Sequence, residues 1–301
     1  MKKLFSLVLA ALMLLSLLAG CGGQPAASGD DDTVVVYTSD IFNTMTPYQT
    51  TANSDQSVFD QVYETLTVTQ DDGTVAPCLA KTWTVSEDCL EYTFRLEEGV
   101  KFHNGEVMTA DDVVYSFEQY IANPAKNNFV SMIEKVEAVD ANTVKITLNK
   151  VTPLFLVYTN ELPILNKKFV EEHNGDISEV ACGTGPYKLT SIDLATSAML
   201  ERNDDYRLTP AAIGKVELRY IGDKSTAAVQ LETGDIDIMR MDPSQLADIE
   251  GNDNFTVETV QTLKTAILAI NTTVAPLDNK LVRQAMTYAV DKESIITVAY
   301  E

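Results

Sequence analysis

Histidine and cysteine are scarce in this chain, which leaves little material for metal or nucleophile chemistry. The 301 residues include only two histidines, His103 and His173, and four cysteines. Neither histidine has a metal-binding side chain four residues further on. The HExxH, GxSxG and GxxxxGK[ST] motifs are absent, and carboxylate pairs cannot be assigned acid and base roles without geometry. The sequence therefore predicts neither an enzyme nor a cofactor nor a metal site.

One glycine-containing segment resembles a phosphate-binding loop only at first sight. Gly183, Thr184 and Gly185 are followed at once by Pro186, and residues 187–189 are typical of an extended strand. A phosphate site would need the N-terminus of a helix at this point. The segment is better interpreted as a tight loop.

Basic residues are few, and their shortage limits the possible partners. Lysine and arginine total 22 against 44 aspartate and glutamate residues, a net charge of −22. Removing residues 1–20 removes two lysines and brings the net charge to about −24. Such a surface repels nucleic acid and anionic membranes, so we expect no nucleic-acid role. It is compatible with neutral or cationic solutes.

The only long hydrophobic run lies at the N-terminus. Lys2 and Lys3 precede residues 4–18, which are almost entirely apolar, and Ala19-Gly20-Cys21 follows. This order is typical of a secretory signal and is short for a membrane span, although an uncleaved anchor is the alternative. Residues 18–21 resemble the lipobox of bacterial lipoproteins, which implies lipidation of Cys21. Residues 1–20 would then be a signal peptide, 21–32 a flexible acidic tether, and the remaining chain would lie outside the cytoplasm.

Three further cysteines, Cys78, Cys89 and Cys182, form an odd number without a CxxC motif. An extracytoplasmic compartment permits a disulfide between Cys78 and Cys89. Cys89 lies at a predicted hairpin turn and Cys78 before the first strand of that hairpin, a spacing that is unfavourable for a bridge. We therefore predict three free thiols.

With 45% hydrophobic residues the chain is globular, and its pattern is mixed α/β. Strands are predicted at 34–37, 216–220, 236–239, 255–260 and 266–271, and hairpins at 83–96 and 135–148. Helices are predicted at 57–65, 109–121, 223–233, 279–290 and from 291, with a short one at 242. The helix at 109 should begin with a capping box. Trp83, Phe94 and Phe102 are expected in the core, and His103 in a turn.

An ordered series of local patterns then identifies a family. The patterns are VYETL at 62–66, PCLAKTWTVS at 77–86, YTFRL at 92–96, GVKFHNG at 99–105, TADDVVYS at 109–116, GTGPY at 183–187, ETGDID at 232–237 and VRQAMTYAVDK at 282–292. Each is weak alone, but their order resembles the family 5 extracellular solute-binding proteins, the dipeptide-, oligopeptide- and nickel-binding subunits of ABC importers. The resemblance covers residues 33–301.

The resemblance implies an architecture as well as a function. We expect a periplasmic-binding-protein-like fold of type II with three domains and mixed sheets. Residues 33–64 and 182–268 would form the main domain of the first lobe, and 65–181 an inserted domain. Residues 269–301 would cross into a second lobe that is largely missing, because relatives continue beyond the point where this chain stops.

The resemblance also implies a site. Peptide-binding relatives contact their ligand from the stretch that corresponds to residues 46–54 here. Within or beside that stretch, the expected ligand contacts are Thr51 and Asn53, through main-chain groups, and Met45 as an apolar lining. Thr184 and Gly185 at the domain return and Asn271 at the hinge complete the set. Plain loop structure is an equal alternative for each.

The implied function is capture of a short peptide for import, by a lipid-anchored monomer that delivers it to the permease subunits of an ABC transporter. Nickel is disfavoured because the relevant stretches, residues 127–130 and 161–166, contain neither the arginine nor the tryptophan of the nickel-binding branch. Alternatives are an oligosaccharide or metal chelate as the solute, a truncated lipoprotein with a non-transport interaction role, and, last, a hydrolase.

Overall fold

The computed structural model describes residues 33–241, 246, 249, 251–259 and 267–300, which divide into two compact units between Met239 and Arg240. The predicted signal peptide, Cys21 and the tether lie outside the described residues, as does most of the short helix predicted at 242. No described helix is long and apolar enough to cross a membrane.

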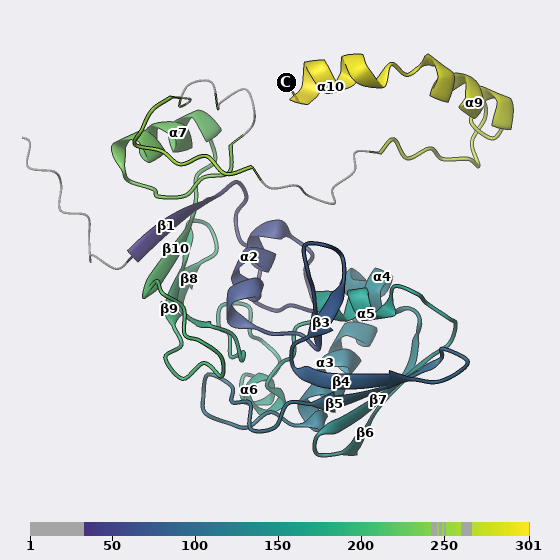
Figure 1. The fold of residues 1–301 in the computed structure, drawn as a ribbon, viewed down its shortest axis with the longest axis vertical. Helices are drawn as coiled ribbons and strands as arrows, with labels where there is room; N and C mark the ends of the chain where they lie inside the picture. Colours follow the sequence, from purple (N-terminus) through teal and green to yellow (C-terminus); the bar gives the residue numbers. More distant parts are fainter. Residues whose placement is uncertain (1–32, 242–245, 247–248, 250, 260–266, 301) are drawn as a thin grey trace, which may run out of the picture. The chain divides into compact units, whose positions relative to one another are not determined.

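The first sheet joins the start of the chain to a segment some 180 residues later. It contains β1 (Thr33–Thr38), β8 (Tyr187–Asp193), β9 (Ser197–Arg202) and β10 (Lys215–Tyr220), in the order β1-β10-β9-β8. β1 pairs in parallel with β10, and the other pairs are antiparallel. Residues 39–186 thus leave this sheet and return to it (Figure 1).

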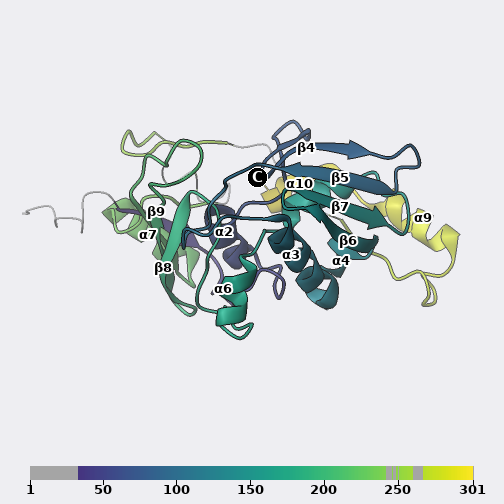
Figure 2. The ribbon, with the colours of Figure 1, turned by 90° about the horizontal axis from the view of Figure 1, so that it is seen from below.

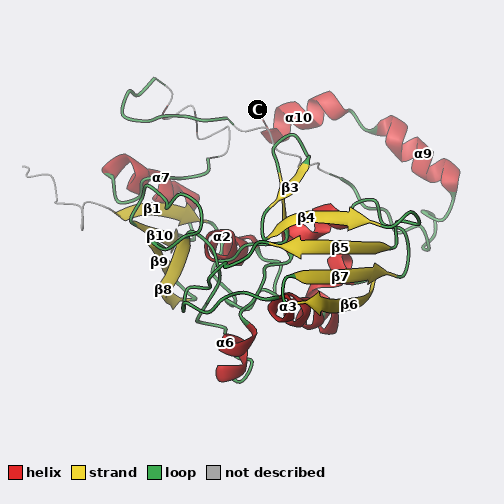
Figure 3. Ribbon diagram, turned by 60° about the horizontal axis from the view of Figure 1, so that its bottom comes forward, coloured by secondary structure: helices red, strands yellow, loops and turns green. Residues whose placement is uncertain are grey.

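The intervening segment builds its own antiparallel sheet. Strands β4 (Ala80–Val85), β5 (Glu91–Leu96), β7 (Thr143–Leu148) and β6 (Ile133–Asp140) are neighbours in that order (Figure 3). A separate small hairpin pairs β2 (Thr67–Thr69) with β3 (Val75–Pro77). The hairpins predicted at 83–96 and 135–148 are confirmed as the antiparallel pairs β4–β5 and β6–β7. The short helices of this segment are η1 (Pro124–Lys126), α4 (Asn127–Val130), α5 (Phe155–Tyr158), η2 (Thr159–Glu161) and α6 (Lys167–Glu172).

Two longer helices pack against these sheets. Helix α3 (Ala110–Ala122) begins with the predicted capping box, in which the Asp112 carboxylate accepts hydrogen bonds from the backbone N–H and hydroxyl of Thr109. It packs on β6 and β7. Helix α2 (Asn53–Val62) lies between the two large sheets in each view, as Figure 2 shows from below. It starts four residues before the predicted point.

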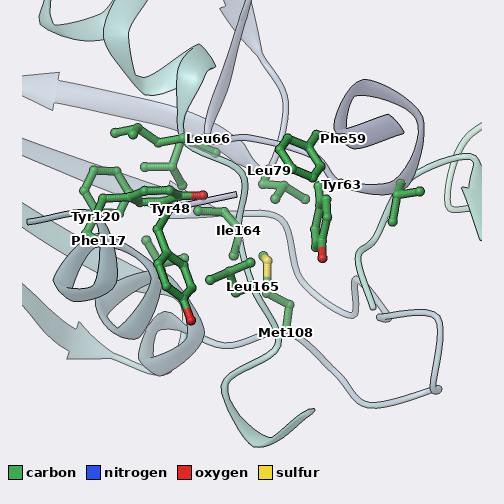
Figure 4. Packing of buried hydrophobic residues seen from close by; sticks show 14 of the residues in the cluster. Tyr48, Phe59, Tyr63, Leu66, Leu79, Met108, Phe117, Tyr120, Ile164 and Leu165 are labelled. Carbon is green, nitrogen blue, oxygen red and sulfur yellow. The ribbon is translucent and has the colours of Figure 1, made fainter. Parts of the chain in front are cut away.

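One large hydrophobic core runs through most of the first unit, and a second small cluster around Tyr37, Ala227 and Ile236 lies beside β1 and α7 (Lys224–Thr233). α2 contributes Val58, Phe59 and Val62 to the large core, all buried. Figure 4 shows Phe59 with the buried Phe117 and Tyr120 of α3. Phe94 and Phe102 are buried in the same core and Trp83 packs against it, as predicted. The division at 64/65 and 181/182 stays a prediction, since this continuous core is shared by both segments.

Helix α7 (Lys224–Thr233) has the predicted Asp223 N-cap, and Gly234 ends it with a φ of 79°, the left-handed conformation typical of glycine. The strand predicted at 236–239 is reduced to one bridge, Ile238 with Val36. Ile238 also extends the ladder through its carbonyl, which accepts the Tyr37 N–H.

The second unit contains α9 (Lys280–Ala289), capped by Asn279, and α10 (Lys292–Tyr300), both predicted. The strands predicted at 255–260 and 266–271 are wrong within the described residues, because 255–259 and 267–271 are irregular. A strand needs a neighbour to satisfy its backbone groups, and no described strand pairs with these residues. No residue of α9 is buried.

Candidate functional site

A hollow of about 530 Å³ opens beside the loop between β1 and α2. Loop residues form nearly all of its wall, and one residue of η1 completes it: Asn43, Thr44, Gln49, Thr50, Thr51, Ala52 and Ala125. The lining consists of neutral polar side chains and small apolar ones. Such a wall can form hydrogen bonds with a ligand but offers it no compensating charge.

A buried carboxylate holds this loop in place. Asp55 is fully buried in the first turn of α2. It accepts hydrogen bonds from the Asn43 N–H and the Thr50 hydroxyl, both at 2.7 Å, and from the Asn43 side-chain amide at 3.3 Å. The N-terminal position in the helix also favours a negative charge. Two lining residues are therefore fixed from inside the protein.

One of the predicted ligand contacts lines this hollow and a second lies next to a lining residue in the sequence. Thr51 is exposed and lines it, and Asn53, the first residue of α2, is exposed beside the lining residue Ala52. Among the described residues, no partner accepts a hydrogen bond from the backbone N–H of Thr51 or Asn53. Both amides are thus available to an incoming acceptor.

Met45 is placed differently from the prediction. Its side chain is 0% exposed and belongs to the core, and it does not line the hollow. Its backbone N–H donates to the Ser178 carbonyl at 2.7 Å, which fixes the start of the loop. The apolar character of Met45 is used for core packing.

Thr184 and Gly185 form the tight loop that was predicted, away from the lining of the hollow. The Gly185 N–H donates to the Val62 carbonyl at 2.9 Å, and its own carbonyl accepts from the Asn203 side chain at 3.1 Å. A Cβ at Gly185 would lie 2.5 Å from the Gln61 carbonyl oxygen, so only glycine fits this approach. Thr184 is buried, and its hydroxyl has no partner among the described residues.

His103 fastens this loop to the turn at 99–105. Its Nε2 donates to the Gly185 carbonyl at 3.0 Å, and its Nδ1 accepts from the Gly183 N–H at 3.3 Å. This pairing uses the neutral ring, which carries its proton on Nε2. Burial lowers the pKa of His103 from 6.5 to about 4. The expectation that His103 serves a turn is met by this geometry.

Asn271 belongs to the second unit, where it is exposed. Its side-chain oxygen accepts the N–H and hydroxyl of Thr273, at 3.0 and 2.8 Å, in a local turn. The predicted hinge and ligand roles of Asn271 stay predictions.

An ion-pair cluster escaped the sequence analysis. Glu64, with 6% of its side chain exposed, binds the Arg207 guanidinium at 2.7 and 3.3 Å and accepts the Tyr206 hydroxyl at 3.0 Å. Arg207 also reaches the Cys78 carbonyl at 3.5 Å. Burial, followed by the Glu64 charge, raises the pKa of the Cys78 thiol to about 11. The sequence did offer one signal for this cluster: the acidic Glu64 lies between the apolar residues of the VYETL pattern at 62–66, where a buried charge would need a partner.

Binding of a metal ion would require several suitable side chains to lie close together in the part of the chain that the structure describes. No group of three or more histidine, cysteine, aspartate or glutamate side chains gathers there in a way that could hold an ion. Cys78, Cys89 and Cys182 are free thiols.

Comparisons with known proteins agree with the architecture. The family model described as bacterial extracellular solute-binding proteins, family 5 Middle, matches residues 74–301. The nickel-binding periplasmic protein of Escherichia coli K12 is 34% identical over 248 residues, covering 78% of this chain and 47% of that protein. The glutathione-binding protein GsiB of Salmonella paratyphi A is 30% identical over 297 residues, covering 96% of this chain and 57% of that protein.

A solved structure has the same fold. The periplasmic binding protein DppA of Helicobacter pylori, in complex with the peptide STSA, superposes with a TM-score of 0.75 at 29% identity. The match covers 89% of this chain and 58% of DppA. The predicted periplasmic-binding-protein-like α/β fold is therefore confirmed, and the chain spans about half the length of the relatives it matches.

Proposed function

The chain belongs to the family 5 extracellular solute-binding proteins of bacteria, and on that premise we propose that it captures a short peptide outside the membrane for an ABC importer. Solute-binding proteins of these importers are not enzymes; they bind a small ligand and pass it to a membrane permease. The identity of the ligand as a peptide is the specific part of the proposal.

The observation that carries it is the uncharged wall with two free backbone amides. Thr51 and Asn53 offer N–H groups at or beside a hollow lined by neutral residues. Extended peptides are recognised through main-chain hydrogen bonds of this kind, whatever their side chains. The peptide-bound DppA structure and the glutathione-binding relative support the same class of ligand.

A metal chelate is the competing cargo, since the nickel-binding relative is 34% identical. Against it, residues 127–130 and 161–166 contain neither arginine nor tryptophan. An oligosaccharide, and a non-transport interaction role, lack a specific supporting observation among the described residues. The peptide therefore remains the preferred ligand.

In the proposed cycle the ligand stabilises a closed form of a two-lobed protein by contacting both lobes. The first unit described above would supply one wall of the site. Lipidation at Cys21 would keep the monomeric protein on the outer face of the membrane, close to its permease.

A proline substitution tests the role of the free amide at the start of α2. Asn53→Pro removes the N–H but suits the first helical position, and the preceding Ala52 is already extended, with φ −71° and ψ 138°. Asn53→Ala removes the side chain and keeps the N–H. We expect the proline variant to lose about tenfold in affinity for a tripeptide by isothermal titration calorimetry, and the alanine variant less than threefold.

Failure to bind any tripeptide, with tight binding of a nickel–histidine complex instead, would contradict the peptide proposal. Equal affinities of the two variants would leave peptide capture intact and remove the Asn53 amide from the site.

A further inference from the structure

Most polar side chains that line the hollow are already occupied. The Asn43 amide donates to the Asp55 carboxylate at 3.3 Å, and the Thr50 hydroxyl donates to it at 2.7 Å. The Thr44 hydroxyl accepts the Thr46 N–H at 3.1 Å. These groups shape the wall and each is tied into the protein by at least one hydrogen bond, although the side-chain oxygen of Asn43 has no partner among the described residues.

Two lining residues have polar side chains that are entirely free. The Gln49 carboxamide and the Thr51 hydroxyl are exposed, and neither forms a hydrogen bond within the described part of the chain. Lys126, the cation next to the lining residue Ala125, is buried instead. Its ammonium group donates to the Glu161 carbonyl at 3.5 Å and lies 5.7 Å from the centre of the Phe129 ring. The free lining groups are therefore neutral.

The backbone under Gln49 is firmly held. Its N–H donates to the Thr46 carbonyl at 3.0 Å, and its neighbours Tyr48 and Thr50 are both buried. The Tyr48 ring packs edge-on against Tyr120, with 6.5 Å between ring centroids, and its hydroxyl donates to the Gly175 carbonyl at 3.2 Å. A long polar side chain thus projects from a turn that is anchored on both sides.

We propose that Gln49 determines cargo selection in this wall by hydrogen-bonding an amide group of the ligand through its own carboxamide. The inference rests on the proposed function and assigns the recognition to one side chain. A carboxamide carries both a donor and an acceptor, so it can match the N–H and C=O of a peptide unit. The recognition is neutral on both sides, and its contribution to affinity is independent of salt.

The test is calorimetric titration with tri-alanine, up to millimolar peptide, of the wild type, Gln49→Leu and Gln70→Leu. Leucine keeps the approximate size of the side chain and removes both hydrogen-bonding groups. Gln70 is an exposed glutamine in the turn between β2 and β3, away from the hollow lining, and provides the matched control. We expect about a tenfold loss for Gln49→Leu, the same at 20 mM and 500 mM NaCl, and less than a twofold change for Gln70→Leu.

The outcomes separate the two proposals. If tri-alanine binds the wild type and Gln49→Leu equally, selection by Gln49 is overturned while peptide capture stands. If the loss appears only at low salt, the neutral hydrogen bond is wrong. If the wild type binds no peptide, both proposals are overturned. Gln49→Ala, with melting temperatures of all variants, separates a loss of contact from a loss of folding.

Discussion

Glu64 illustrates at the scale of a single residue how a buried charge can join distant segments. Glu64 lies just after α2, and its partner Arg207 lies after β9. The two residues are 143 positions apart in the sequence. Both charges are mostly removed from water, with side-chain exposures of 6% and 21%. Breaking such a pair costs more than forming it gains, because one charge is left buried without a partner.

We therefore expect Arg207→Ala to lower the free energy of unfolding by about 3 kcal/mol. The control is Arg95→Ala, whose partner Glu98 and own side chain are both 67% exposed, so the loss there should be below about 0.5 kcal/mol. Urea denaturation measures both. Similar midpoints for the two variants would show that the buried pair contributes no more than a surface pair.

At the same scale, the positions of the expected ligand contacts were the hardest to predict. Thr51 lines the hollow, whereas Met45 is buried in the core, and ligand contact by Thr51 stays a prediction. An apolar residue serves a core and a ligand pocket equally well, and only the path of the loop decides between them. Asp55 carries no motif at all. Its role depends on which donors the folded loop brings to it.

At the scale of elements, prediction succeeded where the signal was local. The hairpin β4–β5 and the caps of α3 and α7 follow from short patterns of turn and capping residues. The start of α2 was missed because its N-cap, Ala52, has no side chain that could accept a backbone hydrogen bond. The strands predicted after residue 254 failed because a strand also requires a distant partner.

His103 links two elements, the 99–105 turn and the 183–185 loop, and makes their junction sensitive to pH. Its pKa is lowered to about 4 in the folded chain, so the unfolded chain binds the proton more readily. The contribution of the neutral His103 ring to the stability of the folded chain is fully present above pH 6.5, and it is lost as the pH falls towards 4. His103→Gln removes the titration. The stability advantage of the wild type over this variant should shrink by about 3 kcal/mol between pH 7 and pH 4.

Thermal or urea unfolding of both proteins across this pH range measures the difference. Because every other titratable group is present in both proteins, only the difference between the two curves reports the imidazole of His103. Parallel curves would contradict the assignment of a neutral, partly buried ring to this junction.

At the scale of the whole molecule, the ordered set of motifs predicted the fold class and family, since many weak patterns in one order are specific together. It could not predict the ligand. Relatives of similar identity carry names as different as nickel-binding and glutathione-binding, and a shared scaffold does not fix what its site selects. The net charge of −22 argued against nucleic acid as a partner, but it did not indicate which solute is bound.

Native mass spectrometry of the purified protein tests the central claim most directly. The protein would be mixed with equal concentrations of tri- and tetrapeptides and of a nickel–histidine complex. We predict an added mass that corresponds to one peptide. An adduct of the nickel complex alone, or no adduct from the whole mixture, would contradict peptide capture.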